Sequence, residues 1–124
     1  MQKSFEKWLE QSEKNLKKDP WLKKLSFDEY FKELISEVEE LNIAFQNNDI
    51  ENIKEELGDV FHDVLTLAFL AEKENKFKAK EIIDSVNKKI AWRKPFIFWD
   101  KDVSYKEAAE IYHKRKQIEK KKKN

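Results

Sequence analysis

Apolar residues recur every three or four positions along most of the chain, which is the period of one face of an α-helix. Polar turns and proline residues interrupt this pattern at intervals. The pattern therefore predicts an all-α fold built from helices over residues 4–18, 26–46, 49–75, 79–93 and 104–123.

Several predicted helix starts carry side chains that satisfy free backbone N–H groups. Ser26 with Glu29, and Ser104 with Glu107, have the spacing of a capping box, in which each side chain bonds the backbone N–H of the other residue. Asp49 follows a polar turn and is a good N-cap for the third helix. These signals predict where the second, third and fifth helices begin.

The composition excludes several other folds and sites. One glycine and two prolines are too few for a hairpin-rich β fold or a glycine-rich phosphate loop. The absence of cysteine excludes a disulfide, a thiolate zinc site and a cysteine nucleophile, and two histidines cannot build a three-histidine zinc site. We therefore expect a helical bundle of about five helices with a central antiparallel hairpin.

Length and charge indicate one folded domain. The chain has 124 residues, of which 40% are hydrophobic and 41% charged, and its formal net charge is +1. We expect a single domain over residues 1–124, with a basic, disordered tail at residues 114–124. No apolar run approaches the length of a membrane span, and the first residues lack the apolar core of a signal peptide. A soluble, cytoplasmic protein is the expectation.

The second and third helices are joined by the short polar turn at residues 46–49, so they should be antiparallel neighbours. Each has an apolar stripe along one face. The stripes consist of Phe31, Leu34, Val38, Leu41 and Phe45 on the second helix, and of Ile53, Leu57, Val60, Phe61, Val64 and Ala68 on the third. A third helix this apolar in so small a chain suggests that oligomerisation buries further surface.

Four carboxylates lie beside these stripes. Glu37 and Glu56 border them, and Glu40 and Asp59 lie one step further out on the same flank. Glu40 and Glu56 have a mean position of 48, as do Glu37 and Asp59, and residue 48 is the middle of the turn. The four side chains should therefore meet at one level, about two helical turns from the hairpin turn.

Carboxylates that approach one another repel unless a cation offsets their charge. Mg²⁺ prefers carboxylate and water oxygens, so this pattern predicts a magnesium site. Gly58, between Glu56 and Asp59, either leaves room for a neighbouring helix or a bound phosphate or is simply tolerated within the helix. Acidic residues three positions apart are also common on exposed helices, so a solvated charged face is the alternative.

The spacing of these acids resembles a known family. Glu37-x-x-Glu40, a 15-residue gap and Glu56-x-x-Asp59 are similar to the ExxE…ExxD signature of the MazG-type nucleoside triphosphate pyrophosphohydrolases. The resemblance runs from about Pro20 to Phe98. It includes the segments DIENIKEELGD (49–59), FLAEKENKF (69–77) and KKIAWRKPFIF (88–98), and Pro20-Trp21 where many members have Cys-Pro-Trp-Asp.

The chain departs from the family pattern outside the four acids. Ser36 stands where many members have an additional glutamate, and Lys94 and Phe96 replace two histidines around a proline. Asp19 and Leu22 break the Cys-Pro-Trp-Asp pattern. These departures bear on base preference and substrate range, whereas the four metal-binding positions match.

The resemblance implies hydrolysis of an NTP or dNTP to the monophosphate and pyrophosphate, with Mg²⁺ and with Mn²⁺ as a substitute. Its catalytic and metal-binding residues would be Glu37, Glu40, Glu56 and Asp59. Asp63 lies one turn beyond Asp59 on the same flank. It is either a further ligand, a group that supports the ligands, or a solvated helix acid.

The resemblance also implies residues that bind the substrate. Lys89 and Arg93, four apart on one helix, match the basic positions of the family segment and would bind the triphosphate, although surface salt bridges are the alternative. Tyr112 and Lys116 resemble a Trp…Lys pair in the last helix of the family, which would stack on the base and reach phosphate. Family members are dimers or tetramers, so we expect a homo-oligomer.

Two other functions compete with this interpretation. A di-iron or di-manganese bundle needs inward Glu-x-x-His pairs, which Asp59-x-x-His62 and Glu110-x-x-His113 superficially offer. His62 lies opposite the apolar stripe and should face water, which argues against that site. A non-enzymatic protein could use the basic tail, residues 114–124, to bind nucleic acid. The rest of the chain is acidic, so nucleic acid is the less favoured partner.

Overall fold

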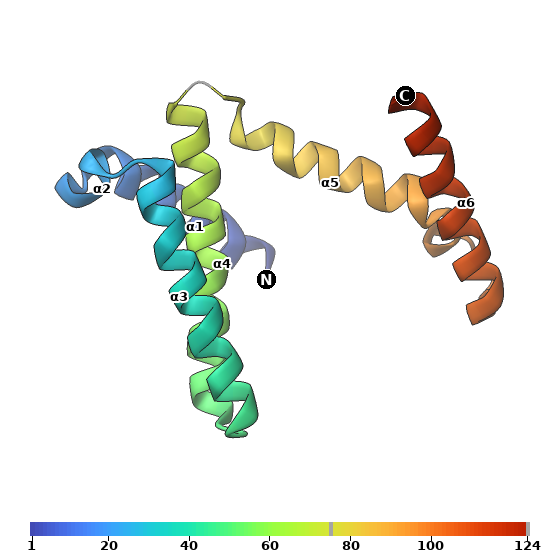
Figure 1. The fold of residues 1–124 in the computed structure, drawn as a ribbon, viewed down its shortest axis with the longest axis horizontal. Coiled ribbons are helices and arrows are strands. Elements are labelled where there is room, and N and C mark those ends of the chain that lie inside the picture. Colours follow the sequence, from blue (N-terminus) through green and yellow to red (C-terminus); the bar gives the residue numbers. More distant parts are fainter. Residues whose placement is uncertain (75, 124) are drawn as a thin grey trace. The chain divides into compact units, whose positions relative to one another are not determined.

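The structure, a computed structural model, describes residues 1–74 and 76–123. Every regular element in these residues is a helix, so the predicted all-α fold is confirmed (Figure 1). The elements are α1 (Gln2–Lys18), α2 (Pro20–Lys24), α3 (Phe27–Gln46), α4 (Ile50–Lys73), α5 (Ala79–Arg93), the 3-10 helix η1 (Pro95–Phe98) and α6 (Tyr105–Lys123). Among the described residues, no helix combines the length and apolar character needed to cross a membrane.

The chain forms two compact units, Met1–Ala79 and Lys80–Asn124. The first unit contains α1 to α4, and the second contains η1, α6 and all but the first residue of α5. The single domain expected over residues 1–124 stays a prediction about the chain as a whole. The end predicted for the third helix, residue 75, lies outside the described residues.

The central hairpin of α3 and α4 begins and turns as the sequence predicts. The Ser26 hydroxyl accepts a hydrogen bond from the Glu29 backbone N–H, and the Glu29 carboxylate accepts one from the Ser26 backbone N–H. The chain reverses through Asn48, whose φ of 52° is left-handed, and Asp49 caps α4 by accepting a hydrogen bond from the Asn52 backbone N–H. The two helices therefore run antiparallel and pack side by side (Figure 1).

Two short helices lie where the sequence analysis expected connecting segments. α2 starts with Pro20 in its first turn, and the Asp19 carboxylate caps it by accepting a hydrogen bond from the Trp21 backbone N–H at 2.9 Å. η1 also has a proline, Pro95, in its first turn, but its N-cap residue Lys94 makes no side-chain capping hydrogen bond. α2 contributes to the fold because its Leu22 is buried in the core.

The residues along which α3 and α4 meet form a seam of buried and half-buried side chains spaced three or four positions apart. On α3 the seam consists of Tyr30, Leu34, Glu37, Leu41 and Ala44, and on α4 of Ile53, Glu56, Val60, Asp63, Leu67 and Leu70. Tyr30, Leu67 and Leu70 join Leu22 in the apolar core of the first unit. That core therefore lies beyond the acids, on the side away from the hairpin turn.

The apolar stripes of α3 and α4 are only half covered by their own chain. Phe31, Val38 and Phe45 on α3, and Leu57, Phe61 and Val64 on α4, are exposed, and Phe61 retains 62% of its accessible surface. Only one edge of each stripe lies in the seam, namely Leu34 and Leu41 on α3 and Ile53 and Val60 on α4. The rest of each stripe borders the seam, so the helices are rotated from the arrangement in which the stripes face one another. Periodicity identifies an apolar face of a helix, but it does not show whether the same chain or another chain covers that face. For this reason the sequence did not predict that the stripes are half exposed.

The expectation that His62 faces water is wrong. α1 packs against α4, and the indole N–H of Trp8 donates a hydrogen bond to Nδ1 of His62 at 3.2 Å. His62 is therefore half-buried beneath α1. Residues so far apart in the chain meet only after folding, and no local pattern links Trp8 to His62.

In the second unit, the bounds of α5 agree with the predicted helix over residues 79–93. The expected disordered tail is helical instead, because α6 continues to Lys123; residue 124 lies outside the described part. Lysine is a good helix former, and this end of α6 contacts α5. Glu119 binds Arg93, and the ammonium of Lys122 lies 5.8 Å from the ring centroid of Trp92.

Candidate metal centre

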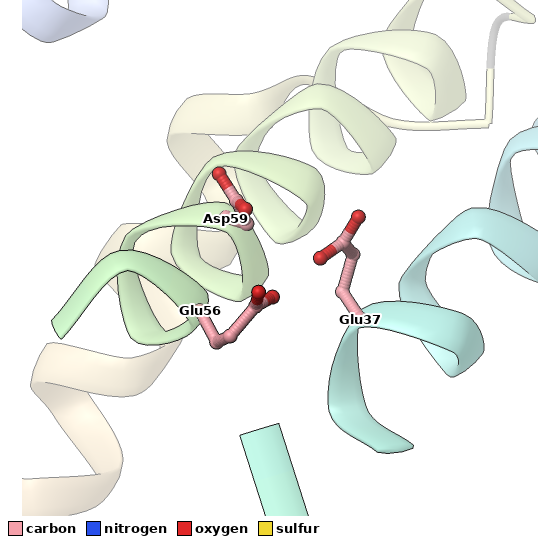
Figure 2. A group of neighbouring side chains, drawn as sticks. All are labelled: Glu37, Glu56 and Asp59. Atoms are coloured by element: carbon pink, nitrogen blue, oxygen red, sulfur yellow. The ribbon is translucent and has the colours of Figure 1, made fainter. Parts of the chain in front are cut away.

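Three carboxylates meet across the seam of the hairpin. Glu37 extends from α3 toward Glu56 and Asp59 on α4, and each side chain offers an oxygen within 4.8 Å of the others (Figure 2). No other group of three or more potential metal ligands occurs among the residues that the structure describes. The site therefore joins two helices that are consecutive in the chain.

Helix geometry explains why these three residues converge. Glu56 and Asp59 are three positions apart, so they lie on the same side of α4. Glu37 occupies a seam position on α3 directly opposite, because the tight turn at residues 47–49 holds the helices antiparallel. The Asp49 cap fixes where α4 begins after the turn, and with it the level at which the acids of the two helices meet.

The environment of the site favours protonated carboxyl groups. Burial and then the neighbouring Glu56, Glu40 and Asp59 raise the pKa of Glu37 from 4.5 to about 7. Burial is also the main cause that raises the pKa of Glu56, whose side chain is only 9% exposed. The centre therefore favours bound protons, or a bound cation, over a set of ionised carboxylates.

The donor set fits a hard divalent cation. Within the described residues, one buried oxygen of Glu37 and one of Glu56 lack any hydrogen-bond partner. Buried carboxylate oxygens are stable when they are paired, protonated or bound to a metal. Mg²⁺ is held by a few carboxylates and completes its octahedron with water or phosphate oxygens. Glu37, Glu56 and Asp59 could hold such an ion and leave positions for a substrate.

Glu40 lies at the edge of this group. It is exposed and is not among the three acids whose oxygens lie within 4.8 Å of one another. Its charge still raises the pKa of both Glu37 and Glu56. The sequence predicts that all four acids meet at one level, whereas the structure brings Glu37 to both acids of α4 and leaves Glu40 at their edge. The reason is the rotation of the helices, which places Glu37 in the seam.

Asp63 is not a solvated helix acid, since only 7% of it is exposed. The phenol of Tyr30 donates a hydrogen bond to its Oδ1 at 2.8 Å. Burial, and next this hydrogen bond, raise the pKa of Tyr30 to about 12. Asp63 is also absent from the group formed by the three acids, so it occupies a separate polar position of the seam.

The four predicted substrate-binding residues all lie in the second unit, where Arg93 and Lys89 act on Glu119. The guanidinium of Arg93 donates hydrogen bonds to both carboxylate oxygens of Glu119, the shortest at 2.9 Å. The charge of Lys89 helps to lower the pKa of Glu119, and Tyr112 helps to raise that of Arg93. The ammonium of Lys116 lies 5.5 Å from the centroid of the Tyr112 ring. Their role toward a substrate stays a prediction.

Sequence reasoning missed two residues that organise these groups, Tyr30 and Glu119. Tyr30 resembles any other apolar position of its helix, and Glu119 stands among lysines at the end of the chain. Neither residue has a local signal, because their partners, Asp63 and Arg93, are 33 and 26 positions away. The rotation of each helix about its axis decides both contacts.

The comparisons with known proteins agree with this architecture. Residues 25–98 match the MazG nucleotide pyrophosphohydrolase domain. The crystal structure of a mazG-related protein from Thermotoga maritima is similar, with a TM-score of 0.85 and 38% sequence identity, and the match covers 90% of this chain and 98% of that chain.

Two relatives with similar sequences are longer proteins. The uncharacterised protein YabN of Bacillus subtilis is 32% identical over 105 residues, which are 85% of this chain and 21% of YabN. The nucleoside triphosphate pyrophosphohydrolase/pyrophosphatase MazG of Thermotoga maritima is 33% identical over 92 residues, which are 73% of this chain and 36% of that protein. This chain therefore corresponds to a fifth to about a third of the curated relatives that it matches.

Proposed function

The chain belongs to the MazG nucleotide pyrophosphohydrolase family, and from this premise we propose that it is a Mg²⁺-dependent nucleoside triphosphate pyrophosphohydrolase. It would hydrolyse an NTP or dNTP between the α- and β-phosphates, which yields the monophosphate and pyrophosphate. Mn²⁺ would substitute for Mg²⁺. Because nucleoside triphosphates are cytoplasmic metabolites, we expect the enzyme in that compartment.

The convergence of Glu37, Glu56 and Asp59 is the observation that carries this proposal. A triphosphate is strongly anionic and would be repelled by these acids unless cations lie between them. A bound cation would neutralise charge on the phosphate oxygens and position the substrate. The acids of the chain would hold that cation, with Glu40 at its exposed side, and one carboxylate oxygen would orient the attacking water.

We also propose that the cluster in the second unit binds the phosphates. Lys89 and Arg93 supply positive charge from one helix, and Lys116 adds a third cation next to the Tyr112 ring. Arg93 presents its planar guanidinium in a fixed direction because Glu119 holds it from one side. The Tyr112 ring would stack on the base.

The exposed stripes support a homo-oligomer. A shallow apolar cavity of about 460 Å³ lies between α1 and α4 and is lined by Met1, Ser4, Phe5, Trp8, Leu57, Gly58 and Phe61. It continues the uncovered apolar side chains of α4, and a contiguous exposed apolar surface is typical of a protein–protein contact. We propose that a second copy of the chain covers this surface, in a dimer or tetramer.

Product analysis tests the proposed reaction. A panel of NTPs and dNTPs is incubated with Mg²⁺ and either the wild type, Glu56→Gln or Asp59→Asn, and the phosphorylated products are separated by anion exchange. Wild type should release monophosphate and pyrophosphate, and both variants should lose this activity. Glu55→Gln is the matched control, since Glu55 is an exposed acid of the same helix.

Two results would contradict the proposal. Release of orthophosphate and diphosphate would mean cleavage at a different phosphate bond. No turnover of any nucleotide, together with salt-sensitive nucleic-acid binding that is lost on removal of residues 114–124, would favour the non-enzymatic alternative.

A further inference from the structure

The seam of the hairpin contains two polar layers, and only one of them belongs to the carboxylate centre. Glu37 and Glu56 form the first layer, and Tyr30 and Asp63 form the second. Tyr30 precedes Glu37 by seven positions and Asp63 follows Glu56 by seven, so both layers lie on the same faces of α3 and α4. The second layer is about two helical turns from the first, on the side away from the hairpin turn.

The second layer is buried and has a defined hydrogen bond. Tyr30 is 6% exposed and Asp63 is 7% exposed, and the Tyr30 phenol donates to Asp63 Oδ1 at 2.8 Å. In the described part of the chain, the other oxygen of Asp63 has no partner. The carboxylate thus depends on Tyr30, because a buried acid without a donor would carry a large desolvation cost.

Tyr30 is itself held firmly. Its ring belongs to the apolar core with Leu22, Leu67 and Leu70, and it packs against Trp21, with the ring centroids 6.2 Å apart. The hydrogen bond to Asp63 therefore joins α4 to a ring that α2 and α3 already fix. An attachment of this kind limits both the separation of α3 and α4 and their rotation about their axes.

The carboxylate layer needs such an attachment. Its acids repel one another. The tight turn restrains α3 and α4 at one end, and a hydrogen bond from the Phe27 backbone N–H to the Glu74 carboxylate joins them at the far end, so Tyr30 and Asp63 hold the stretch between that end and the acids. Resting on the metal site proposed above, we propose that the hydrogen bond between Tyr30 and Asp63 clamps this stretch of the hairpin and so positions Glu37 against Glu56 and Asp59. Tyr30 and Asp63 are positioning residues, and neither contacts the cation or the substrate.

The test compares stability with cation binding in the full chain. The variants are Tyr30→Phe, Asp63→Leu, Asp63→Asn and the double variant Tyr30→Phe/Asp63→Leu. Thermal unfolding gives the stability of each protein, and calorimetric titration with Mn²⁺ gives its affinity for the cation. Trp8→Phe is the matched control, because it removes a different hydrogen bond between two helices of the same unit.

A clamp predicts a particular pattern across these variants. Tyr30→Phe and Asp63→Leu should each lower Tm and weaken Mn²⁺ binding about tenfold, the lower end of the range for groups that support metal ligands. Asp63→Asn keeps an acceptor for the phenol and should bind Mn²⁺ like the wild type. The double variant has an apolar layer and should regain Tm, since apolar replacements of buried polar pairs are often neutral. It should not regain the affinity.

The outcomes that contradict the clamp are distinct from those that contradict the metal site. If the double variant recovers Mn²⁺ affinity together with Tm, the pair is only structural and the clamp is overturned. The same holds if Trp8→Phe weakens Mn²⁺ binding as much as Tyr30→Phe does. If the wild type binds no Mn²⁺, the proposed metal site itself fails, and the positioning role fails with it.

Discussion

The carboxyl groups of Glu37 and Glu56 approach each other across the seam of α3 and α4, within one group of oxygens that also includes Asp59. They come from helices joined by a tight turn, so the contact forms within one hairpin. Burial and the neighbouring acids raise the pKa of Glu37 to about 7. The same contact that would create the metal site therefore also costs stability when no cation is present.

The stability of the metal-free protein should fall as pH rises from about 4.5 to 7. In this window folded Glu37 keeps a proton that the unfolded chain has already lost, so raising the pH favours unfolding. Thermal unfolding in EDTA between pH 4.5 and 8 measures the effect. Glu37→Gln should flatten the profile in this window, whereas a profile that stays as steep would place the titration elsewhere.

Magnesium should reverse this loss of stability. An ion that binds only the folded chain stabilises it by about 2.7 kcal/mol at 100 times its dissociation constant. Because protons compete with the ion for Glu37, the rise in Tm with Mg²⁺ should be larger at pH 8 than at pH 6. Differential scanning calorimetry gives both values. An equal rise in Asp59→Asn would show that Mg²⁺ binds outside this centre.

Replacing Arg93 by glutamine should raise KM for the nucleotide more than it lowers kcat. Arg93 would contact the phosphates equally in the enzyme–substrate complex and in the transition state. Its loss should therefore weaken the binding of both states by a similar amount. Initial-rate kinetics under saturating Mg²⁺ separate the two parameters. Lys121→Gln is the control for the loss of one positive charge from the second unit. A similar KM increase in this control would indicate a general charge effect.

Glu119→Gln tests the orientation of Arg93 without removing the guanidinium. Each side chain of this ion pair keeps only about a quarter of its surface exposed, and its loss should lower Tm slightly. KM should rise, but less than in Arg93→Gln, because the positive charge remains. A lower KM would mean instead that Glu119 competes with the phosphates for Arg93.

Phe61→Glu should dissociate the oligomer. Phe61 lies in the exposed stripe and in the cavity between α1 and α4, where a charge from each copy would be brought into an apolar contact. Sedimentation velocity reports the assembly state. Tyr105→Glu, at a side chain that is 90% exposed in the second unit, should leave assembly unchanged. A wild-type protein that sediments as a monomer would contradict the proposed assembly.

Gly58→Ala should stabilise the protein by up to about 1 kcal/mol. Alanine favours the interior of a helix over glycine, and a Cβ placed at Gly58 would meet no atom within 4 Å. Denaturant unfolding measures the difference. A loss of stability that depends on protein concentration would show instead that a second copy approaches Gly58 closely in the oligomer.

Local signals in the sequence were sufficient for most of the helices. The capping box at Ser26, the N-cap at Asp49 and Pro95 after α5 act through neighbouring residues, and each lies where the sequence predicts. α2 was missed although Asp19-Pro20 is a recognisable helix start, because a helix of five residues has no measurable periodicity. The acidic motif also indicated the family, and it predicted four converging acids, of which the structure brings three together.

Tertiary structure decided what the helical faces contact. The sequence identifies the apolar stripes of α3 and α4, but it does not show whether these stripes are covered by their own chain or by another chain. The rotation that leaves Phe61 exposed also places Glu37 in the seam and brings Tyr30 to Asp63. Contacts of this kind join residues far apart in the chain, and they depend on the packing of all the helices together. The sequence by itself thus determines where most helices start and which residues form the acidic motif. How the acids pair, and the contact between Tyr30 and Asp63, depend on how the helices pack.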